Sequence, residues 1–281
     1  MKFMPARKRE GNSELRTIFA LAGLAALIIV TFVVPQHLVQ AAKSTTGSTA
    51  QLLPDIRPDA ATLQDNDLVY DPQTGHVLLR FAGGIADYAS GKLEIVGIRE
   101  STNPDNNTLS AYQRVYNTDG TYSQVPVGTL IYHPAHHHWH FANAVEYRLI
   151  DPNAKKGNVI IVAQKQSFCL ADVAVVDPKV QNYPTQPKYN RCYNMPSDVT
   201  NFVLMGVSPG WEDIYGKDLV GQSMDVTDLM QKPAQKYILE EITNPAGLLK
   251  DINNGTPQRT SVEVTIGQGV PVGTGVVRPG V

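Results

Sequence analysis

Short apolar runs separated by turn residues recur along most of this chain, and no long amphipathic helical pattern lies between them. The runs are rich in Val, Ile, Leu and Tyr, which suit the pleated surface of a strand. Many short strands without crossover helices predict a mainly β fold, an antiparallel β-sandwich or distorted barrel with long loops and little helix. The expected strands are 76–81, 93–98, 140–150, 158–164, 199–207, 236–242 and 260–266.

Composition supports a globular domain and excludes some classes of partner. The chain has 42% hydrophobic and 18% charged residues, which is a normal balance for a packed core. Gly and Pro, 22 and 19 of 281 residues, supply many turns, such as the one expected at 82–84. The net charge of -2 provides no basic field, so we expect no nucleic-acid partner.

The N-terminal segment predicts export. Basic residues precede an apolar run over 17–34, and Val39-Gln40-Ala41 offers small residues for signal-peptidase cleavage. An uncleaved membrane anchor is the alternative, because the run approaches the length that spans a bilayer. Both interpretations make the remainder secreted or extracytoplasmic, with membrane contact only if the segment stays uncleaved.

Four segments follow from these patterns. We expect a signal peptide or signal anchor at 1–41, a small and polar linker at 42–52, a folded domain at 53–266 and a flexible tail at 267–281. Cys169 and Cys192 are an even pair in an exported chain, so a disulfide bond is expected between them.

A histidine cluster is the strongest chemical signal. Five of the seven histidines lie within YHPAHHHWH at 132–140. On an extended strand His136, His138 and His140 share one face, and His137 and Trp139 share the other. Positions 136 and 140 would be roughly 13 Å apart on an ideal strand, so one ion could bind both only if the strand bends or bulges.

Two interpretations of the cluster compete. A surface metal-sequestering tract is one, but such tracts are usually low-complexity tails, and this stretch continues directly into FANAVEYRLI. We therefore favour a specific metal site with His133 and His137 beside it. The Irving–Williams order favours copper, and zinc is the main competitor.

With this cluster in place, the chain resembles the catalytic domain of the lysyl oxidase family. Its motifs occur in the family's order, and their joint occurrence is more specific than any one of them. They are LPDIRPD (53–59), HVLLRF (76–81), HPAHHHWH (133–140), QKQSFCLAD (164–172), SPGWEDIYG (208–216), VTD (226–228), KYIL (236–239) and TNP (243–245).

The resemblance assigns roles to five residues. His136, His138 and His140 match the family's copper ligands, and Lys165 and Tyr215 match the pair that forms its lysine tyrosylquinone. Without the resemblance, Lys165 would be interpreted as a charge at a strand end and Tyr215 as an aromatic residue in a turn.

The implied activity is oxidative deamination of primary amines, either peptidyl lysine or small amines, to aldehydes. Dioxygen would be consumed, and hydrogen peroxide and ammonia released. The reaction needs a general base. Asp213 is near Tyr215 in sequence, but we expect it to be an exposed turn carboxylate.

Some positions depart from the family pattern. Animal members carry several disulfides in this domain, whereas this chain has two cysteines, and Ala135 stands where a cysteine is usual. Some members hold calcium between the domain opening and a late acidic loop. Asp55 and the stretch 251–254 are similar, and oxygen ligands suit calcium, although turn capping explains them equally well.

Two alternative functions remain open. A non-catalytic extracellular copper-binding or copper-buffering domain would need the histidines but neither Lys165 nor Tyr215. A zinc hydrolase on a β scaffold would need a carboxylate base beside the metal and no quinone. Amine-dependent release of peroxide distinguishes the amine oxidase from both.

Overall fold

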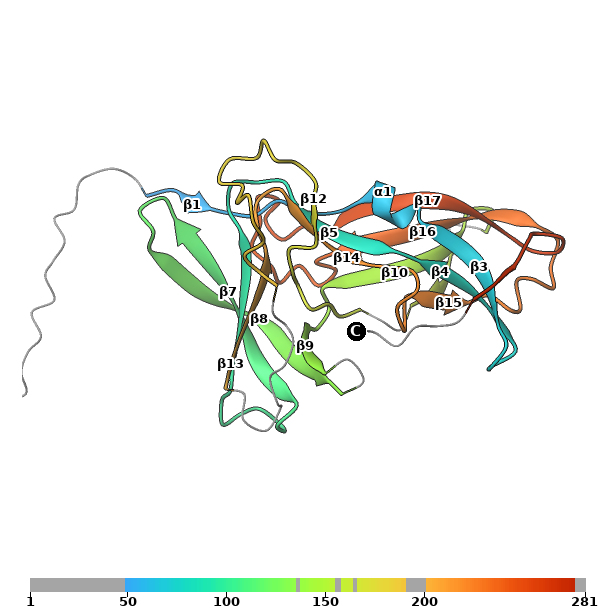
Figure 1. Cartoon of the computed structure of the whole chain (residues 1–281), viewed down its shortest axis with the longest axis horizontal. Coiled ribbons are helices and arrows are strands. Elements are labelled where there is room, and N and C mark those ends of the chain that lie inside the picture. Colours follow the sequence, from blue (N-terminus) through green and yellow to red (C-terminus); the bar gives the residue numbers. More distant parts are fainter. Residues whose placement is uncertain (1–48, 135–136, 155–157, 164–165, 191–200, 276–281) are drawn as a thin grey trace, which may run out of the picture. The chain divides into compact units, whose positions relative to one another are not determined.

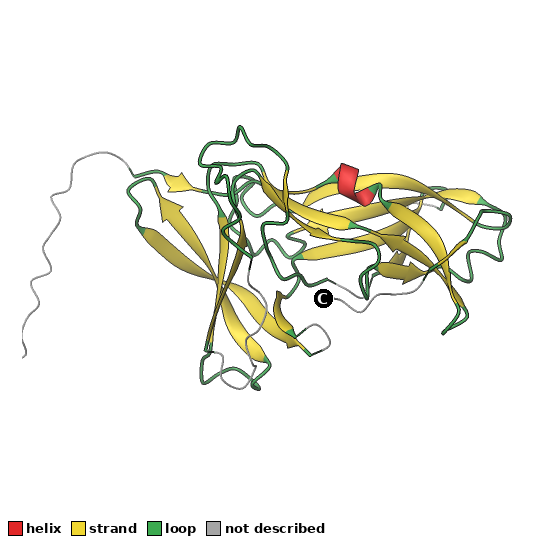
Figure 2. Cartoon of the chain, in the orientation of Figure 1, coloured by secondary structure: helices red, strands yellow, loops and turns green. Residues whose placement is uncertain are grey.

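The computed structural model describes residues 49–134, 137–154, 158–163, 166–190 and 201–275. These residues are mainly β, as expected. Contacts divide the chain into two units, Met1–Gly47 and Ser48–Val281, and the description below concerns the second. Figures 1 and 2 show strands joined by long loops, and the described residues include a short helix, α1. The fold prediction is therefore confirmed.

The first sheet carries the histidine-rich hairpin. Its strands pair antiparallel, and β1 (Gln51–Leu52) adds to the side of β7. Buried and half-buried positions alternate along β7, as expected for a strand with one face on the core. In order across the sheet, the strands are β13 (Phe202–Val207), β6 (Leu93–Ile98), β7 (Thr108–Asn117), β8 (Tyr122–His133) and β9 (His138–Phe141).

Three four-stranded sheets complete the domain. The second sheet contains β11 (Asn158–Val162), β10 (Val145–Asp151), β16 (Gln235–Thr243) and β17 (Gln258–Ile266). The third contains β12 (Ala174–Val175), β14 (Trp211–Tyr215), β5 (Gly83–Asp87) and β2 (Ile56–Pro58). The fourth contains β15 (Ser223–Asp225), β4 (His76–Phe81), β3 (Asn66–Asp71) and β18 (Gly273–Thr274), where β18 pairs parallel with β3.

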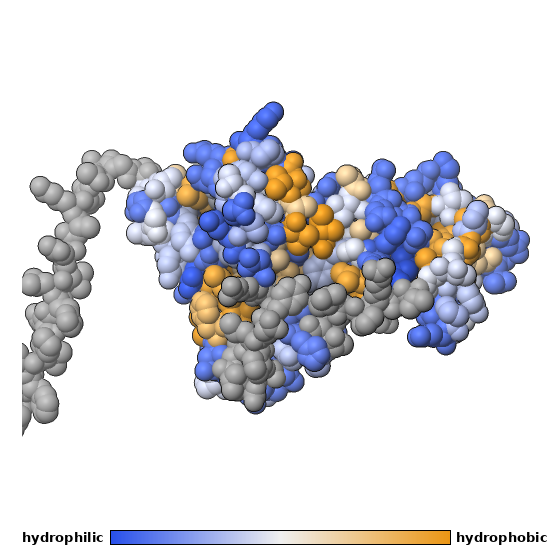
Figure 3. Space-filling model, in the orientation of Figure 1, coloured by the Kyte–Doolittle hydropathy of each residue, from blue (hydrophilic) through white to orange (hydrophobic). Residues whose placement is uncertain are grey.

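One helical turn, α1 (Ala60–Leu63), lies between β2 and β3. The Asp59 side chain caps it by accepting a hydrogen bond from the Ala61 N–H. Apolar side chains from all four sheets form one buried cluster that includes Trp139, Phe168 and Tyr215. On the visible face, polar residues cover most of the surface and apolar patches are separate (Figure 3).

Several strand predictions agree with the structure, and two local ones were wrong. Strands 76–81 and 93–98 have the expected bounds. The run 140–150 is divided between β9 and β10 by a turn, in which Asn143 adopts a φ of 57° that an extended strand excludes. Residues 83–84 begin β5 instead of making a turn, because Gly83 provides space for a buried tyrosine.

The segment boundaries stay predictions. Strand β1 lies in the expected linker and β18 in the expected tail, each as a two-residue strand. The export segment lies outside the described residues. Within the residues described, no helix is long and apolar enough to span a bilayer.

Candidate metal and cofactor site

The hairpin formed by β8 and β9 positions the histidine cluster. His133 on β8 is the cross-strand partner of His138 on β9, and Ile131 is the partner of His140. Strand β9 begins only at His138, so the expected alternation applies to 138 and 140 and not to 137. His137 is exposed in the turn with a φ of 55°, so the chain is not extended at this residue.

His138 and His140 converge on the interior. Their side chains are almost fully buried, and their Nε2 atoms are 2.8 Å apart. The His140 Nδ1 lies 3.0 Å from the Ser167 hydroxyl, which fixes the orientation of the ring. The His133 ring stacks on the His140 ring at a centroid distance of 5.2 Å. Trp139 faces the opposite side and packs against Tyr132.

This geometry fits a transition-metal ion. Two nitrogens bound at a right angle to one ion, each at about 2.0 Å, would be about 2.8 Å apart. Metal-bound histidines commonly have their second nitrogen held by a hydrogen-bonding group, as Ser167 does for His140. Among the described residues no group of three or more histidine, cysteine or carboxylate side chains could hold an ion. A three-histidine site therefore requires His136, which lies outside that part of the chain.

Tyr215 lies beside these histidines. It is 75 positions downstream of His140 in sequence, yet the two ring centroids are 6.3 Å apart, edge to face. Its hydroxyl accepts a 2.7 Å hydrogen bond from the Cys169 N–H, and its ring stacks on Phe168 at 4.0 Å. Tyr215 ends strand β14 and is buried, so the interpretation as a turn aromatic was wrong.

The segment after Lys165 reaches the same place. Phe168 and Phe141 form a β-bridge with backbone hydrogen bonds in both directions, of 2.7 and 3.2 Å. This bridge brings Ser167 to His140 and Phe168 to Tyr215. Lys165 is outside the described residues, so its own position is not observed. The sequence did not indicate Ser167 or Phe168, because neither residue type signals a site without its neighbours.

Buried carboxylates lie on the strand of Tyr215 and on β16. Asp213 is 1% exposed within β14, so the expectation of an exposed turn carboxylate was wrong. Strand β14 pairs with the buried strand β5, which removes Asp213 from solvent. Gly83 is the cross-strand partner of Tyr215, and a Cβ there would lie 1.8 Å from the Tyr147 hydroxyl. This hydroxyl donates a 3.3 Å hydrogen bond to Glu241.

Burial controls the pKa of these groups. Glu241 is fully enclosed, and burial raises its pKa well above the usual range. Burial also raises the pKa of Glu212 to about 7, an effect that a hydrogen bond from Thr62 partly offsets and Asp59 reinforces. Burial raises the pKa of Tyr147 as well, so this phenol stays protonated.

The residues considered for calcium are engaged with protein groups. The Asp55 carboxylate accepts hydrogen bonds from Arg57 Nε at 3.0 Å and from Asn253 Nδ2 at 3.1 Å. Asp251 accepts the N–H groups of Asn253 and Gly255 as a turn cap. The structure thus joins the domain opening to the late loop, and calcium binding stays a prediction. Cys169 is buried, but Cys192 lies outside the described residues, so their pairing also stays a prediction.

Comparisons with known proteins give partial sequence matches. The chain is 31% identical to human protein-lysine 6-oxidase over 121 residues, which is 43% of this chain and 24% of that protein. It is 28% identical to lysyl oxidase homolog 3 of human and of mouse over 116 residues, 41% of this chain and 13% of each relative. The matches thus span a quarter or less of these relatives.

The family comparison covers more of the chain. The lysyl oxidase family model matches residues 97–259, more than half of the 281 residues. The matched range contains the β8–β9 hairpin, Ser167, Phe168 and Tyr215. The chain therefore belongs to the lysyl oxidase family.

Proposed function

We propose that this protein is a secreted or extracytoplasmic, copper-dependent amine oxidase acting on primary amines. One amine, one dioxygen and one water would give an aldehyde, ammonia and hydrogen peroxide. The observation that carries the proposal is the proximity of Tyr215 to His140, whose Nε2 faces that of His138. A copper-binding domain without catalysis would not need a tyrosine at this position.

Three histidines would hold the metal. His138 and His140 present their Nε2 atoms to one point, and His136 is the proposed third ligand. Imidazole suits copper, and Ser167 would keep His140 in the orientation that leaves Nε2 for the ion. The protein relatives whose names include "lysyl oxidase" or "protein-lysine 6-oxidase" support an oxidase of this kind.

Tyr215 and Lys165 are the proposed precursors of the quinone cofactor. Lys165 is two residues before Ser167, so their Cα atoms are at most about 7 Å apart. A lysine side chain is long enough to span that distance toward the site beside Ser167. The copper and the lysine tyrosylquinone would together supply the oxidising centre for the amine.

The surrounding residues prepare Tyr215 for this role. The Cys169 N–H holds the hydroxyl oxygen, and the stacked Phe168 ring fixes the plane of the phenol. Both contacts are buried, which excludes bulk water from the ring. Because the contacts come from the segment that follows Lys165, the same segment would position both precursors.

The test compares copper-loaded wild type with Lys165→Arg and Tyr215→Phe. Wild type made without copper should contain unmodified Lys165 and Tyr215 peptides, and copper with air should produce a cross-linked pair and a visible quinone band. Adding a primary amine should then release peroxide. Both variants should bind copper but lose the cross-link, the band and the peroxide, since Arg is a poor nucleophile and Phe has no hydroxyl.

Amine-active protein with ordinary peptides at both positions would overturn the quinone assignment. Copper uptake with no cross-link and no activity would instead favour the copper-buffering domain.

A further inference from the structure

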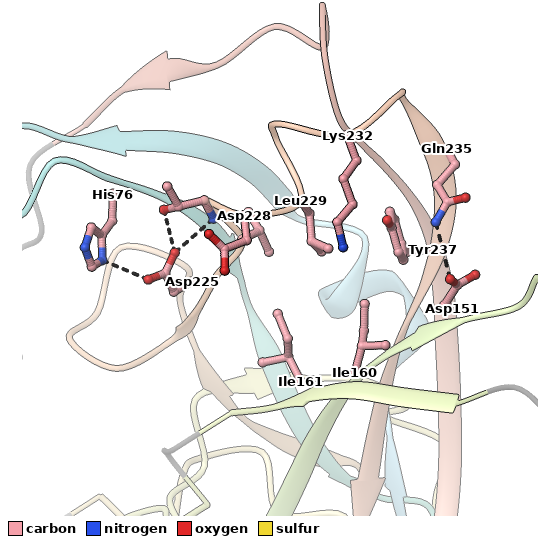
Figure 4. A pocket seen from close by; sticks show the side chains of 12 residues that line it. His76, Asp151, Ile160, Ile161, Asp225, Asp228, Leu229, Lys232, Gln235 and Tyr237 are labelled. Carbon is pink, nitrogen blue, oxygen red and sulfur yellow. Dashed lines mark hydrogen bonds and ion pairs between the residues drawn. The ribbon is translucent and has the colours of Figure 1, made fainter. Parts of the chain in front are cut away.

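A second cavity lies between the second and fourth sheets. Its volume is about 560 Å³, and it is lined by β4 and β15 on one side and by β10, β11 and β16 on the other (Figure 4). Neither His138 nor His140 lines it. It is therefore a separate site from the metal and cofactor site.

An apolar floor results from a local irregularity in β11. Ile161 pairs with Leu149 and Val159 with Ile150, so Ile160 is an extra residue without a cross-strand partner. A bulge of this kind re-aims side chains. Ile160 and Ile161 both point into the cavity, where Leu229 lies opposite them (Figure 4).

Carboxylates outnumber cations in the cavity lining. The acidic residues are Asp151, Asp225 and Asp228, against Lys232 and His76. His76 is paired with Asp225 at 2.8 Å, and Asp151 accepts a hydrogen bond from Gln235. Asp228 is exposed, and neither it nor Lys232 forms an ion pair within the described part of the chain. The cavity thus retains an excess of negative charge.

A buried hydroxyl also opens into the cavity. Tyr237 is only 2% exposed, yet its hydroxyl has no hydrogen-bond partner among the described residues and points into the cavity (Figure 4). Because it reaches the cavity, this hydroxyl is available to a ligand. The side chain of Lys232 extends into the same space toward Ile160 (Figure 4), so an aliphatic stem with an ammonium group fits there.

The cavity lining is also close in sequence to the proposed cofactor residue. Ile161 is four positions before Lys165, which limits the distance between their Cα atoms to about 14 Å. A polypeptide bound along the cavity would therefore extend within a few residues of the oxidising centre. A small amine would not span this distance.

We propose that this cavity is an exosite that binds a cationic, lysine-rich segment of a protein substrate. The inference rests on the proposed amine oxidase function and deepens it by giving a protein substrate a second binding site away from the oxidising centre. The aliphatic stem of a bound lysine would pack on Ile160, Leu229 and Tyr237, and its ammonium would pair with Asp228. Lys232 occupies part of the site in the free protein and would compete for that place.

The test uses opposite changes of charge in the full-length protein. Binding of a fluorescent lysine-rich peptide is followed by anisotropy on copper-free protein at low salt, so the result does not depend on turnover. Asp228→Asn should weaken binding about two- to fivefold, and Lys232→Gln should tighten it by a similar factor. Both effects should decrease as salt is added. Glu263→Gln, which removes an exposed carboxylate on β17, should have no effect.

Steady-state kinetics on the copper-loaded protein completes the test. Asp228→Asn should raise KM for the peptide, and Lys232→Gln should lower it. Both variants should leave kcat and the oxidation of a simple alkyl monoamine unchanged. Unchanged peptide binding in Asp228→Asn, or weaker binding in Lys232→Gln, would overturn the exosite. Monoamine oxidation would then still support the proposed function. Loss of all amine oxidation with the expected binding pattern would refute the oxidase and leave a site for cationic peptides.

Discussion

Two buried polar clusters in this domain solve the problem of burial differently. At the first, Glu94 accepts hydrogen bonds from Lys92, Tyr116 and Tyr189 at 2.6–2.7 Å, with Arg114 at 3.3 Å. Burial alone would raise the pKa of Glu94, but these donors outweigh it and hold the pKa below the usual value. The carboxylate is thus surrounded by donors that compensate its charge.

The histidine site is arranged differently. The Nε2 atoms of His138 and His140 face each other at 2.8 Å, and a single hydrogen between them is all that two neutral rings can share. Beside them Tyr215 is stacked on Phe168, an apolar ring. At the Glu94 cluster a buried charge is surrounded by its donors, whereas at the histidine site two like groups face each other.

The largest expected effect is loss of copper from the histidine site. His138→Ala and His140→Ala should each reduce copper affinity by more than about a hundredfold, since each removes a proposed ligand. Metal analysis after dialysis and a copper titration would measure it. His137→Ala is the matched control and should retain stoichiometric copper, because His137 is exposed in the turn. Equal loss at all three positions would indicate a loose histidine tract.

The Glu94 cluster should show the reverse behaviour. Glu94→Gln should lower the free energy of unfolding by about 2–4 kcal/mol, because it leaves buried donors and cations without their acceptor. Copper binding by the folded variant should be unchanged. Denaturant unfolding would measure the loss, with Glu100→Gln as the control at a less buried carboxylate that accepts bonds from Tyr112 and Ser110. No loss of stability would remove the distinction between the clusters.

A smaller effect is expected at Ser167. Ser167→Ala should weaken copper binding about tenfold, because His140 would lose the group that orients its Nδ1. The protein should stay folded and retain Tyr215 in place, so the defect should appear in the copper titration and not in the unfolding curve. Ser167→Thr keeps a hydroxyl and should restore most of the affinity. An Ala variant with normal copper affinity would refute the orienting role.

A pH-dependent effect is expected at Glu212, a buried carboxylate that forms no ion pair within the described residues. Its pKa is raised to about 7 in the folded protein from 4.5, so folding favours the protonated form. Its contribution to stability is present below about pH 4.5 and is lost as the pH rises through about 7. Relative to Glu212→Gln, wild type should lose stability over this window, by about 3 kcal/mol at most. Unfolding curves at several pH values would measure it, and a constant difference would contradict it.

Glu94 provides the opposite sign for this test. Because its pKa is lowered, its contribution is present at neutral pH and is lost as the pH falls through the folded pKa. In acid, wild type should therefore lose the stability advantage that it has over Glu94→Gln at neutral pH. At Glu212 the change is opposite, because wild type should gain stability relative to Glu212→Gln as the pH falls. The two profiles together separate a compensated carboxylate from an uncompensated one.

The sequence predicted the fold class because strand formation depends on local patterns. Runs such as 76–81 and 93–98 satisfy the strand preferences of their own residues, and the structure has them with the same bounds. Positions that depend on distant neighbours were predicted less well. Gly83 and Gly84 suggested a turn, but they lie in a strand where Tyr147 and Glu212 leave no space for a Cβ.

For the site, local patterns predicted the residue types and their order: clustered histidines with His138 and His140 on one face, and a lysine and a tyrosine in family motifs. The contacts over long separations came from the tertiary structure: Tyr215 is buried beside His140, and Ser167 and Phe168 connect the two. The physical reason is separation along the chain. Contacts over 27 to 75 positions are fixed by sheet pairing and core packing, which no local pattern encodes.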